Sequence, residues 1–368
     1  MPPPRLVAAP PRKGTGWKTA ALVLGCLLAI SLFFNPLHFV QLLLRGAASP
    51  GRAAGPKLQE TLVEDNDSPN KIALIPVEGI ITSDFLEHGN YGMVEYIKDQ
   101  LKMAAQDDRV KAVVLKVNSP GGEVLASDEI SNAISKFQND SSKPVVVSMG
   151  SLAASGGYYV SAPCRWIVAN ELTITGSIGV IMHTYNYRGL MNKVGLQPLV
   201  YKSGRYKDML SGEKDLEKLS PAEKEDLAFE EKMVKDLIGQ TFDKFKSVVA
   251  EGRKNSNQSN EQSKDSKGQT LSAKWTDYAD GRVLSGKEAH ELGFVDELGS
   301  FDVAVRRARK LAKVDSANLV QYQQIFDLST LLRMLGKSES PKIQIDSGFD
   351  LPKLKAGQLY LLSPTFAH

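Results

Sequence analysis

Two segments of this chain carry side chains that could perform acyl transfer. In Gly150-Ser-Leu-Ala-Ala-Ser155-Gly-Gly-Tyr-Tyr159, a serine lies among very small residues, directly after the apolar run 144–149. Tyr201-Lys-Ser-Gly-Arg-Tyr-Lys207-Asp208 supplies a lysine. A serine hydroxyl is a weak nucleophile at neutral pH, and lysine can be its base once desolvation lowers the lysine pKa from about 10.4. Each segment alone also fits a plainer interpretation, a tight turn around Ser155 and a solvated surface position for Lys207.

Two glycine motifs accompany these segments. Asn118-Ser-Pro-Gly121-Gly122 ends the strand predicted at 110–117, and Thr175-Gly-Ser177-Ile-Gly179 follows another strand. Taken together and in this order, the motifs resemble the signal peptide peptidase A family of membrane-anchored Ser-Lys peptidases, over about residues 70–312. The resemblance implies that Ser155 is the nucleophile, that Lys207 is the general base and that Ser177 orients the lysine amine. It assigns the oxyanion hole to the amides of Gly122 and Gly156.

The same resemblance implies substrates and an assembly. We expect peptide substrates, such as remnant signal peptides, and no cofactor. In single-domain relatives the serine of one subunit meets the lysine of its neighbour. We therefore expect a homo-oligomer with its active sites at subunit interfaces.

Other chemistries fit the residues less well. His183 lies 28 residues after Ser155, so a Ser-His-Asp arrangement of the Clp type is the alternative, but its surroundings lack a His-Gln-Pro type signature. Cys164 has no histidine near it in sequence, and we expect a buried structural thiol. A crotonase-type acyl-CoA enzyme and a catalytically inactive membrane scaffold remain further alternatives, although neither needs the Ser155 and Lys207 pair. No residues have metal-ligand spacing and no phosphate loop is present, so neither a metal nor ATP is expected.

The elements that must position these residues follow from apolar spacing. Runs at 71–77, 110–117 and 144–149 read as buried strands, and apolar residues recur at helical spacing around 94–104 and 130–137. Strands that alternate with amphipathic helices predict an α/β fold with a parallel sheet. By the resemblance, this is the ββα spiral of the Clp/crotonase type.

A long helix is predicted in the second half of the chain. Ser220-Pro-Ala-Glu223 is a capping box that begins a helix to about Ala250, and Ser285 with Glu288 forms a second box. Leu237 and Phe245 lie on one apolar face of the long helix. We expect that face to pack in the core, with partner binding as the alternative. The polar stretch 255–270 is predicted to be a mobile surface insertion.

The N-terminal part predicts a membrane anchor. The net charge of +3 includes seven basic and no acidic residues in 1–57, so the rest of the chain carries −4 and offers no basic stripe for nucleic acid. Residues 19–44 lack charged side chains, and as a helix they would span about 39 Å, enough for a hydrocarbon core of about 30 Å. Cleavage near 47–49, or a lipoprotein box ending at Cys26, are the alternatives.

The domain organisation follows from these features. We predict a basic segment at 1–18, a transmembrane anchor at 19–44, a linker at 45–69, a peptidase domain at 70–312 and an extension of unknown role at 313–368. Four basic residues precede the anchor and three follow it, which favours a cytoplasmic N-terminus. The catalytic domain is then expected on the exoplasmic side of the cell membrane, held by a single pass.

Overall fold

The computed structural model describes residues 21–25, 58–83, 92–262, 267–324 and 360–362. Contacts divide the chain into two units, Met1–Ala54 and Gly55–His368, and the second contains the folded domain. Its elements are β1 (Leu58–Glu64), β2 (Lys71–Glu78), α2 (Met93–Gln106), β3 (Val110–Ser119), β4 (Gly121–Glu123), α3 (Val124–Ser141), β5 (Val145–Ala154), α4 (Gly156–Ser161), β6 (Trp166–Ala169), β7 (Ile174–Gly176), α5 (Arg188–Lys193), α6 (Pro221–Gln262), a 3-10 turn (Trp275–Tyr278), β8 (Val283–Ser285), α7 (Gly286–Glu291), β9 (Glu297–Leu298), α8 (Phe301–Ala312), β10 (Asn318–Gln324) and β11 (Tyr360–Leu362).

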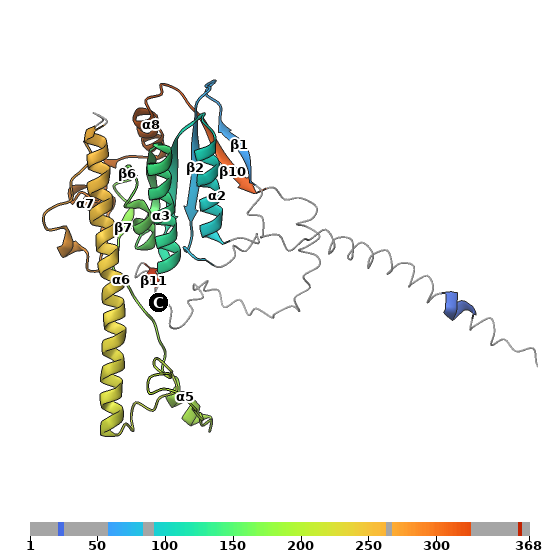
Figure 1. Ribbon diagram of the computed structural model, residues 1–368, viewed down its shortest axis with the longest axis vertical. Helices are drawn as coiled ribbons and strands as arrows, with labels where there is room; N and C mark the ends of the chain where they lie inside the picture. Colours follow the sequence, from blue (N-terminus) through green and yellow to red (C-terminus); the bar gives the residue numbers. More distant parts are fainter. Residues whose placement is uncertain (1–20, 26–57, 84–91, 263–266, 325–359, 363–368) are drawn as a thin grey trace, which may run out of the picture. The chain divides into compact units, whose positions relative to one another are not determined.

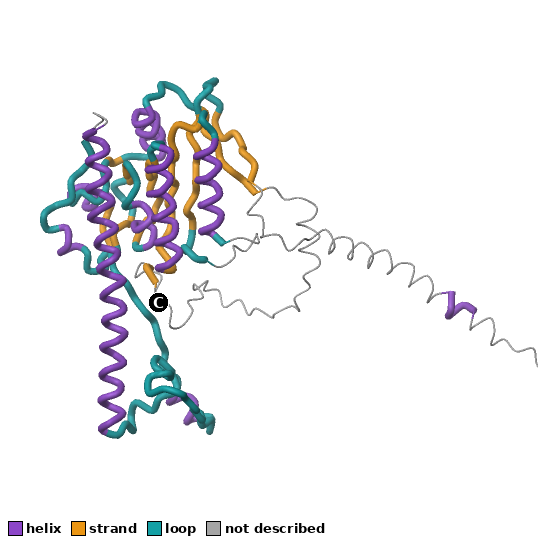
Figure 2. Tube along the Cα trace, in the orientation of Figure 1, coloured by secondary structure: helices purple, strands orange, loops and turns teal. Residues whose placement is uncertain are grey.

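A mixed sheet forms the centre of the domain, in the order β1-β10-β2-β3-β5-β6-β9. From β10 to β9 every neighbouring pair is parallel, and β1 is the antiparallel edge strand. Figure 1 shows α2 and α3 side by side along one face of this sheet, and Figure 2 shows the strands gathered between the helices. The expected α/β organisation is therefore confirmed.

Both faces of the sheet are buried, as the continuous apolar runs require. Alternate residues of β2 point to opposite faces: Ile75 and Val77 belong to the larger hydrophobic cluster, which includes residues of α2 and α3, whereas Ile72 belongs to a second cluster. The second cluster includes Ala304 and Ala308 of α8, whose small side chains let that helix approach the strands closely. Two helical layers thus hold the central strands rigidly.

The strand β5 pairs with two different strands along its length, and this change of partner positions the candidate active site. Its first half, Val146 to Ser148, pairs with β6, whereas its last residues, Leu152 to Ala154, pair with β7. The end of β5 therefore leaves the main sheet and lies beside β7, which in turn pairs with β8. Because of this change of partner, Ser155, the residue after Ala154, lies in a turn beside the end of β7.

The folded domain extends beyond the boundaries expected from the sequence. The predicted linker contains β1 and the predicted extension contains β10, and the two strands pair over Leu58–Glu64. A side chain bond reinforces the pairing, because Asn318 Oδ1 accepts from the amide of Asn66 at 2.7 Å. Residues on both sides of 70–312 thus complete one edge of the sheet.

The helix α6 is longer than predicted. It begins at Pro221 after the expected Ser220 and Glu223 capping box, but it ends at Gln262. The prediction of a mobile insertion was wrong for 255–262, because polar residues there find buried partners: the Ser256 hydroxyl donates to the Arg165 carbonyl at 2.6 Å. Residues 263–266 lie outside the described part of the chain.

The expected packing of α6 holds only for its second half. Phe245 is fully buried in the core, whereas the side chain of Leu237, two turns earlier, is 46% exposed. The N-terminal half of α6 instead carries the segment 201–214 through the Arg205–Asp226 ion pair and the Tyr206–Phe229 ring contact.

The predicted membrane anchor falls almost entirely outside the described residues. Of the span 19–44, the structure describes 21–25, which are helical. Among the described residues, no helix is both long and apolar enough to cross a membrane.

Candidate active site

Ser155 lies in the turn between β5 and α4. Its φ of +54° and ψ of −116° are values that a residue with a side chain adopts only under strain. The backbone is fixed there by two bonds: the Ser155 amide donates to the Gly176 carbonyl and its own carbonyl accepts from the Tyr159 amide, each at 2.8 Å. The hydroxyl is buried and has no hydrogen-bond partner within the described residues. The fold therefore fixes the position of this hydroxyl and gives it no hydrogen-bond partner within the described residues.

The two predicted oxyanion-hole glycines lie close to each other, and Gly156 directly follows Ser155 in the chain. A Cβ added to Gly156 would lie 2.7 Å from Ser127 Oγ and 3.1 Å from the Gly122 amide nitrogen. A Cβ added to Gly122 would lie only 1.9 Å from the Ile81 carbonyl oxygen. Glycine is thus the only residue that fits at Gly122, and the backbones of Gly122 and Gly156 approach each other closely.

The β5–β7 pairing also brings Ser177 to the site. In that parallel pair Ala154 lies opposite Gly176, so Ser155 and Ser177 follow their strands side by side. Ser177 is buried, has a φ of +51°, and is fixed by its amide, which donates to the Arg282 carbonyl at 2.8 Å. The motifs that contain Ser155, Ser177 and Gly122 therefore lie together around the turn after β5.

Lys207 is the predicted site residue that the single chain does not bring into contact with Ser155. Its side chain is exposed and makes no hydrogen bond or ion pair to any described residue. It belongs to the segment that Arg205 and Tyr206 attach to the first half of α6. Asp208, the next residue, pairs with a different lysine. Lys202 Nζ donates to the Asp208 carboxylate at 2.7 Å, and this hydrogen bond lowers the pKa of Asp208. No carboxylate is thereby committed to Lys207.

Comparisons with known proteins match this arrangement. The chain is 34% identical to a candidate signal peptide peptidase SppA from Enterococcus faecium, over 73% of this chain and 71% of the relative. It is 35% identical to a candidate protease from Synechocystis sp., over 73% of this chain and 84% of the relative. The family model for Peptidase family S49 matches residues 137–315, which include Ser155 and Lys207. The chain belongs to peptidase family S49.

Two further matches cover parts of this S49 peptidase. The family model for Clp protease matches residues 85–166, in agreement with the expected Clp-like α/β fold. Among solved structures, the membrane-bound stomatin-specific protease 1510-N in complex with a substrate peptide is 15% identical, with a TM-score of 0.39, over 72% of this chain and 97% of that chain. Membership of family S49 makes the chain a serine peptidase.

Cys164 takes no part in the chemistry of this S49 peptidase. The thiol is fully buried and donates to the Val160 carbonyl, and burial raises its pKa far above the range in which a thiolate forms. The expected structural role is consistent with both observations. His183 is only partly buried, and its Nε2 atom has no hydrogen-bond partner within the described residues.

The acidic residue nearest the glycine motif is also structural. Glu123 follows Gly122 directly, and one of its carboxylate oxygens accepts from the amide of Ser83 at 2.9 Å and from the Ser83 hydroxyl at 2.6 Å. The other oxygen accepts from the Thr82 hydroxyl at 3.2 Å. A crotonase-type enzyme needs a free carboxylate in the site, and Glu123 instead joins β4 to the segment that follows β2.

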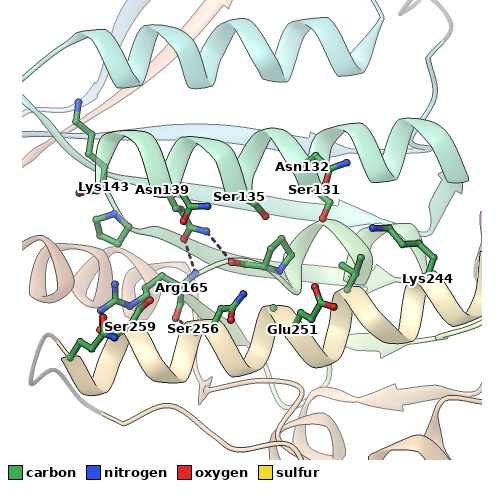
Figure 3. A pocket seen from close by; sticks show the side chains of 18 residues that line it. Ser131, Asn132, Ser135, Asn139, Lys143, Arg165, Lys244, Glu251, Ser256 and Ser259 are labelled. Carbon is green, nitrogen blue, oxygen red and sulfur yellow. Dashed lines mark hydrogen bonds between the residues drawn. The ribbon is translucent and has the colours of Figure 1, made fainter.

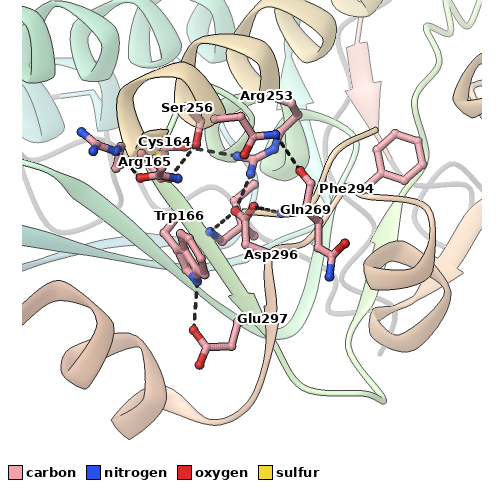
Figure 4. A network of polar contacts seen from close by, with 12 residues as sticks. Cys164, Arg165, Trp166, Arg253, Ser256, Gln269, Phe294, Asp296 and Glu297 are labelled. Atoms are coloured by element: carbon pink, nitrogen blue, oxygen red, sulfur yellow. Dashed lines mark hydrogen bonds and ion pairs between the residues drawn. The ribbon is translucent and has the colours of Figure 1, made fainter. Parts of the chain in front are cut away.

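A buried ion pair fixes α6 to the domain, and no motif in the sequence indicates it. Arg253 and Asp296 are both almost fully inaccessible and form an ion pair (Figure 4). Arg253 also donates to the Cys164 carbonyl at 3.2 Å, while Asp296 accepts from the Ile167 amide at 2.8 Å. The pair therefore attaches the C-terminal half of α6 to the folded domain.

A polar groove of about 500 Å³ lies between α3 and α6 (Figure 3). Its walls carry Ser131, Ser135, Lys244 and Glu251 among others, and none of the predicted site residues lines it. The groove is therefore separate from the site around Ser155.

Proposed function

We propose that this S49 peptidase is a membrane-anchored endopeptidase whose site is completed by two copies of the chain. Ser155 of one copy attacks the peptide carbonyl, and Lys207 of a neighbouring copy takes the serine proton and returns it to the leaving amine. The amides of Gly122 and Gly156 bind the oxyanion, and one such donor is worth about 3 kcal/mol of transition-state stabilisation. Ser177 orients the lysine amine.

The observation that carries this proposal is the state of the Ser155 hydroxyl. It is buried, held in a strained turn directly before Gly156, and without a hydrogen-bond partner among the residues that the structure describes. A buried hydroxyl normally has a hydrogen-bond partner. A base supplied by a second copy provides that partner, and Lys207 is an exposed lysine whose side chain pairs with none of the described residues.

Exposed apolar residues support the second copy as the source. Around Lys207 the side chains of Leu190, Val194, Leu199 and Tyr201 are 64%, 69%, 79% and 91% exposed. Such a concentration of exposed apolar surface is typical of an interaction surface. When a neighbouring copy covers it, Lys207 loses water, and desolvation favours the neutral amine that a base requires.

The membrane part of the proposal rests on residues 19–44. This uncharged stretch is long enough to span a bilayer, and its flanking charges favour a cytoplasmic N-terminus. The peptidase domain then lies on the exoplasmic side, where membrane-associated peptides such as remnant signal peptides are its substrates.

The experiment that tests the function is labelling with an acylating, serine-directed probe. Mass spectrometry of the digested protein is expected to locate the adduct on Ser155, with no adduct in Ser155→Ala and a much slower reaction in Lys207→Ala. Lys193→Ala, an exposed lysine of α5, is the matched control and should react like the unmodified protein. An adduct on another residue, or equal rates in Lys207→Ala and Lys193→Ala, would contradict the Ser-Lys assignment.

A further inference from the structure

Ser119 is a fully buried serine at the C-terminal end of β3. It lies three residues before Gly122, one of the two proposed oxyanion donors. In the β3–β5 pair it is opposite Ala153, two residues before Ser155. The side chain therefore lies among the segments that carry the candidate active site, and the proposed chemistry does not use its hydroxyl.

The Ser119 hydroxyl fixes the turn that leads to Gly122. The Gly121 amide donates to Ser119 Oγ at 3.1 Å, across Pro120, and the hydroxyl in turn donates to the Gly121 carbonyl at 3.5 Å. Gly121 has a φ of +101°, a conformation that residues with a side chain rarely adopt. A serine hydroxyl that bonds backbone groups two residues ahead stabilises turns of this kind. Loss of the hydroxyl would leave the buried Gly121 amide without its acceptor.

The other edge of the turn determines where the Gly122 amide points. The Ile81 amide donates to the Gly121 carbonyl at 2.9 Å. The Glu123 amide donates to the Ile81 carbonyl at 2.8 Å. Because backbone groups of successive residues in a strand point in opposite directions, the Gly122 amide points to the opposite edge of β4. Its direction thus depends on how Gly121 is held.

Ser119 also contacts the helix α4, which carries the second proposed donor. A Cβ added to Gly157 would lie 2.8 Å from the Ser119 carbonyl oxygen and 3.5 Å from Ser119 Cβ. The preceding residue, Gly156, is the second donor, and a Cβ added there would lie 3.0 Å from Gly121 Cα and 3.1 Å from the Gly122 nitrogen. Ser119 is therefore bonded to the turn of one donor and packed against the helix of the other.

We propose that Ser119 is a positioning residue for the oxyanion hole, whose hydroxyl holds the Gly121 turn so that the Gly122 amide lies beside the Gly156 amide. This proposal rests on the proposed function, because the two amides are the donors assigned there. Ser119 acts through its neighbours and transfers no proton. Oxyanion donors bind the transition state more strongly than the bound substrate, so a displaced donor lowers kcat and leaves KM nearly unchanged.

The variant Ser119→Ala removes the hydroxyl, and hydrolysis of a fluorogenic peptide by the full chain measures the effect. We expect kcat to fall about a hundredfold, with KM within about twofold of that of the unmodified chain. Ser256→Ala is the matched control, because Ser256 is also buried and its hydroxyl donates to the Arg165 carbonyl at 2.6 Å. The control should keep its kcat. A kcat for Ser119→Ala within about threefold of the control, or a loss carried by KM alone, would overturn the proposal.

A peptide aldehyde gives a readout that a merely structural loss would not change. Ser155 Oγ bonds to the aldehyde carbon, the serine proton passes to the base, and the former carbonyl oxygen becomes an oxyanion in the hole. In Ser119→Ala the inhibition constant of the aldehyde should rise by the factor by which kcat/KM falls. The matching peptide alcohol forms no such adduct and should bind both proteins equally. An unchanged inhibition constant for the aldehyde, in a folded variant with lowered kcat, would refute the assignment to the oxyanion hole.

Two conservative variants decide the matter if Ser119→Ala fails to fold, which circular dichroism would show. Ser119→Thr keeps the hydroxyl and should restore most of kcat. Ser119→Cys replaces the hydroxyl by a thiol, a weaker acceptor, and should give a kcat below that of the threonine variant. Equal kcat in the folded cysteine, threonine and unmodified chains would contradict a role for this hydroxyl.

Hydrogen exchange distinguishes a failure of this proposal from a failure of the proposed function. Ser119→Ala should speed exchange at the Gly121 amide about tenfold, and Ser256→Ala should not. Unchanged exchange at Gly121 would rule out the hydroxyl as the group that holds the turn. Faster exchange in a protein that neither hydrolyses peptide nor labels at Ser155 would uphold the role of Ser119 in the turn and refute the peptidase chemistry.

Discussion

Removal of the Ser155 hydroxyl should stabilise the fold while it abolishes activity. The hydroxyl is fully buried and has no hydrogen-bond partner in the described part of its chain, and leaving such a group unsatisfied costs about 1–3 kcal/mol. Ser155→Ala should therefore raise the free energy of unfolding by about 1–2 kcal/mol. The comparison belongs in a Lys207→Ala background, which removes the partner that a neighbouring copy is proposed to supply.

Ser161 provides the matched control for this measurement. It is equally buried, but its hydroxyl donates to the Gly157 carbonyl at 2.7 Å, so Ser161→Ala should lower the unfolding free energy by about 1 kcal/mol. In urea unfolding followed by circular dichroism, the two alanine variants should move the midpoint in opposite directions. A midpoint for Ser155→Ala below that of its parent chain would refute the view that the fold leaves this hydroxyl unsatisfied.

The variant Ser155→Gly tests the backbone strain of the turn separately from the cost of leaving the hydroxyl without a hydrogen bond. A side chain at φ +54° costs about 1–3 kcal/mol, and glycine relieves that cost but loses about 0.5–1 kcal/mol through its greater freedom when unfolded. The glycine variant should therefore be at least as stable as Ser155→Ala. A clearly less stable glycine variant would show that the turn is not strained.

Three further predictions concern the chemistry, the position of α6 and the topology. His183→Ala should keep most of the peptidase activity, and a loss as complete as that of Ser155→Ala would favour the histidine mechanism. Arg253→Ala should lower the unfolding free energy by about 3–5 kcal/mol, because it leaves Asp296 buried and unpaired, whereas Lys246→Ala at a surface pair should cost less than about 1 kcal/mol; similar losses would refute the structural role of the buried pair. Protease added outside intact cells should digest the peptidase domain and leave an N-terminal membrane-held fragment, and protection until lysis would reverse the topology.

Local patterns in the sequence predicted the parts of the structure that local chemistry decides. The strands around 110–117 and 144–149, the helices around 94–104 and 130–137, and the capping box of Ser285 and Glu288 all form as expected. The placement of Ser155 at a strand-to-helix turn follows from the same patterns, because small residues permit the turn and the apolar run before it forms a buried strand. The resemblance supplied the fold name and the roles of the site residues.

Features that depend on distant partners could not be predicted. The pairing of β1 with β10 joins residues about 250 positions apart, and the continuation of α6 to Gln262 depends on buried contacts such as that of Ser256 with Arg165. The strand β11 has an ordinary apolar sequence, and its pairing with β4 joins residues that are far apart in the chain. The proposed meeting of Lys207 with Ser155 involves a second copy of the chain, and no local pattern in a single sequence places two copies against each other.

Mixing two inactive proteins tests the central claim most directly. Ser155→Ala and Lys207→Ala, each assembled and inactive alone, are mixed under conditions in which mass spectrometry demonstrates subunit exchange. If each site takes its serine from one copy and its lysine from the next, random mixing of equal amounts leaves both residues intact at about a quarter of the interfaces. The account predicts recovery of about that share of the activity of the unmodified protein. No recovery despite demonstrated exchange would contradict it and would place the whole site within one chain.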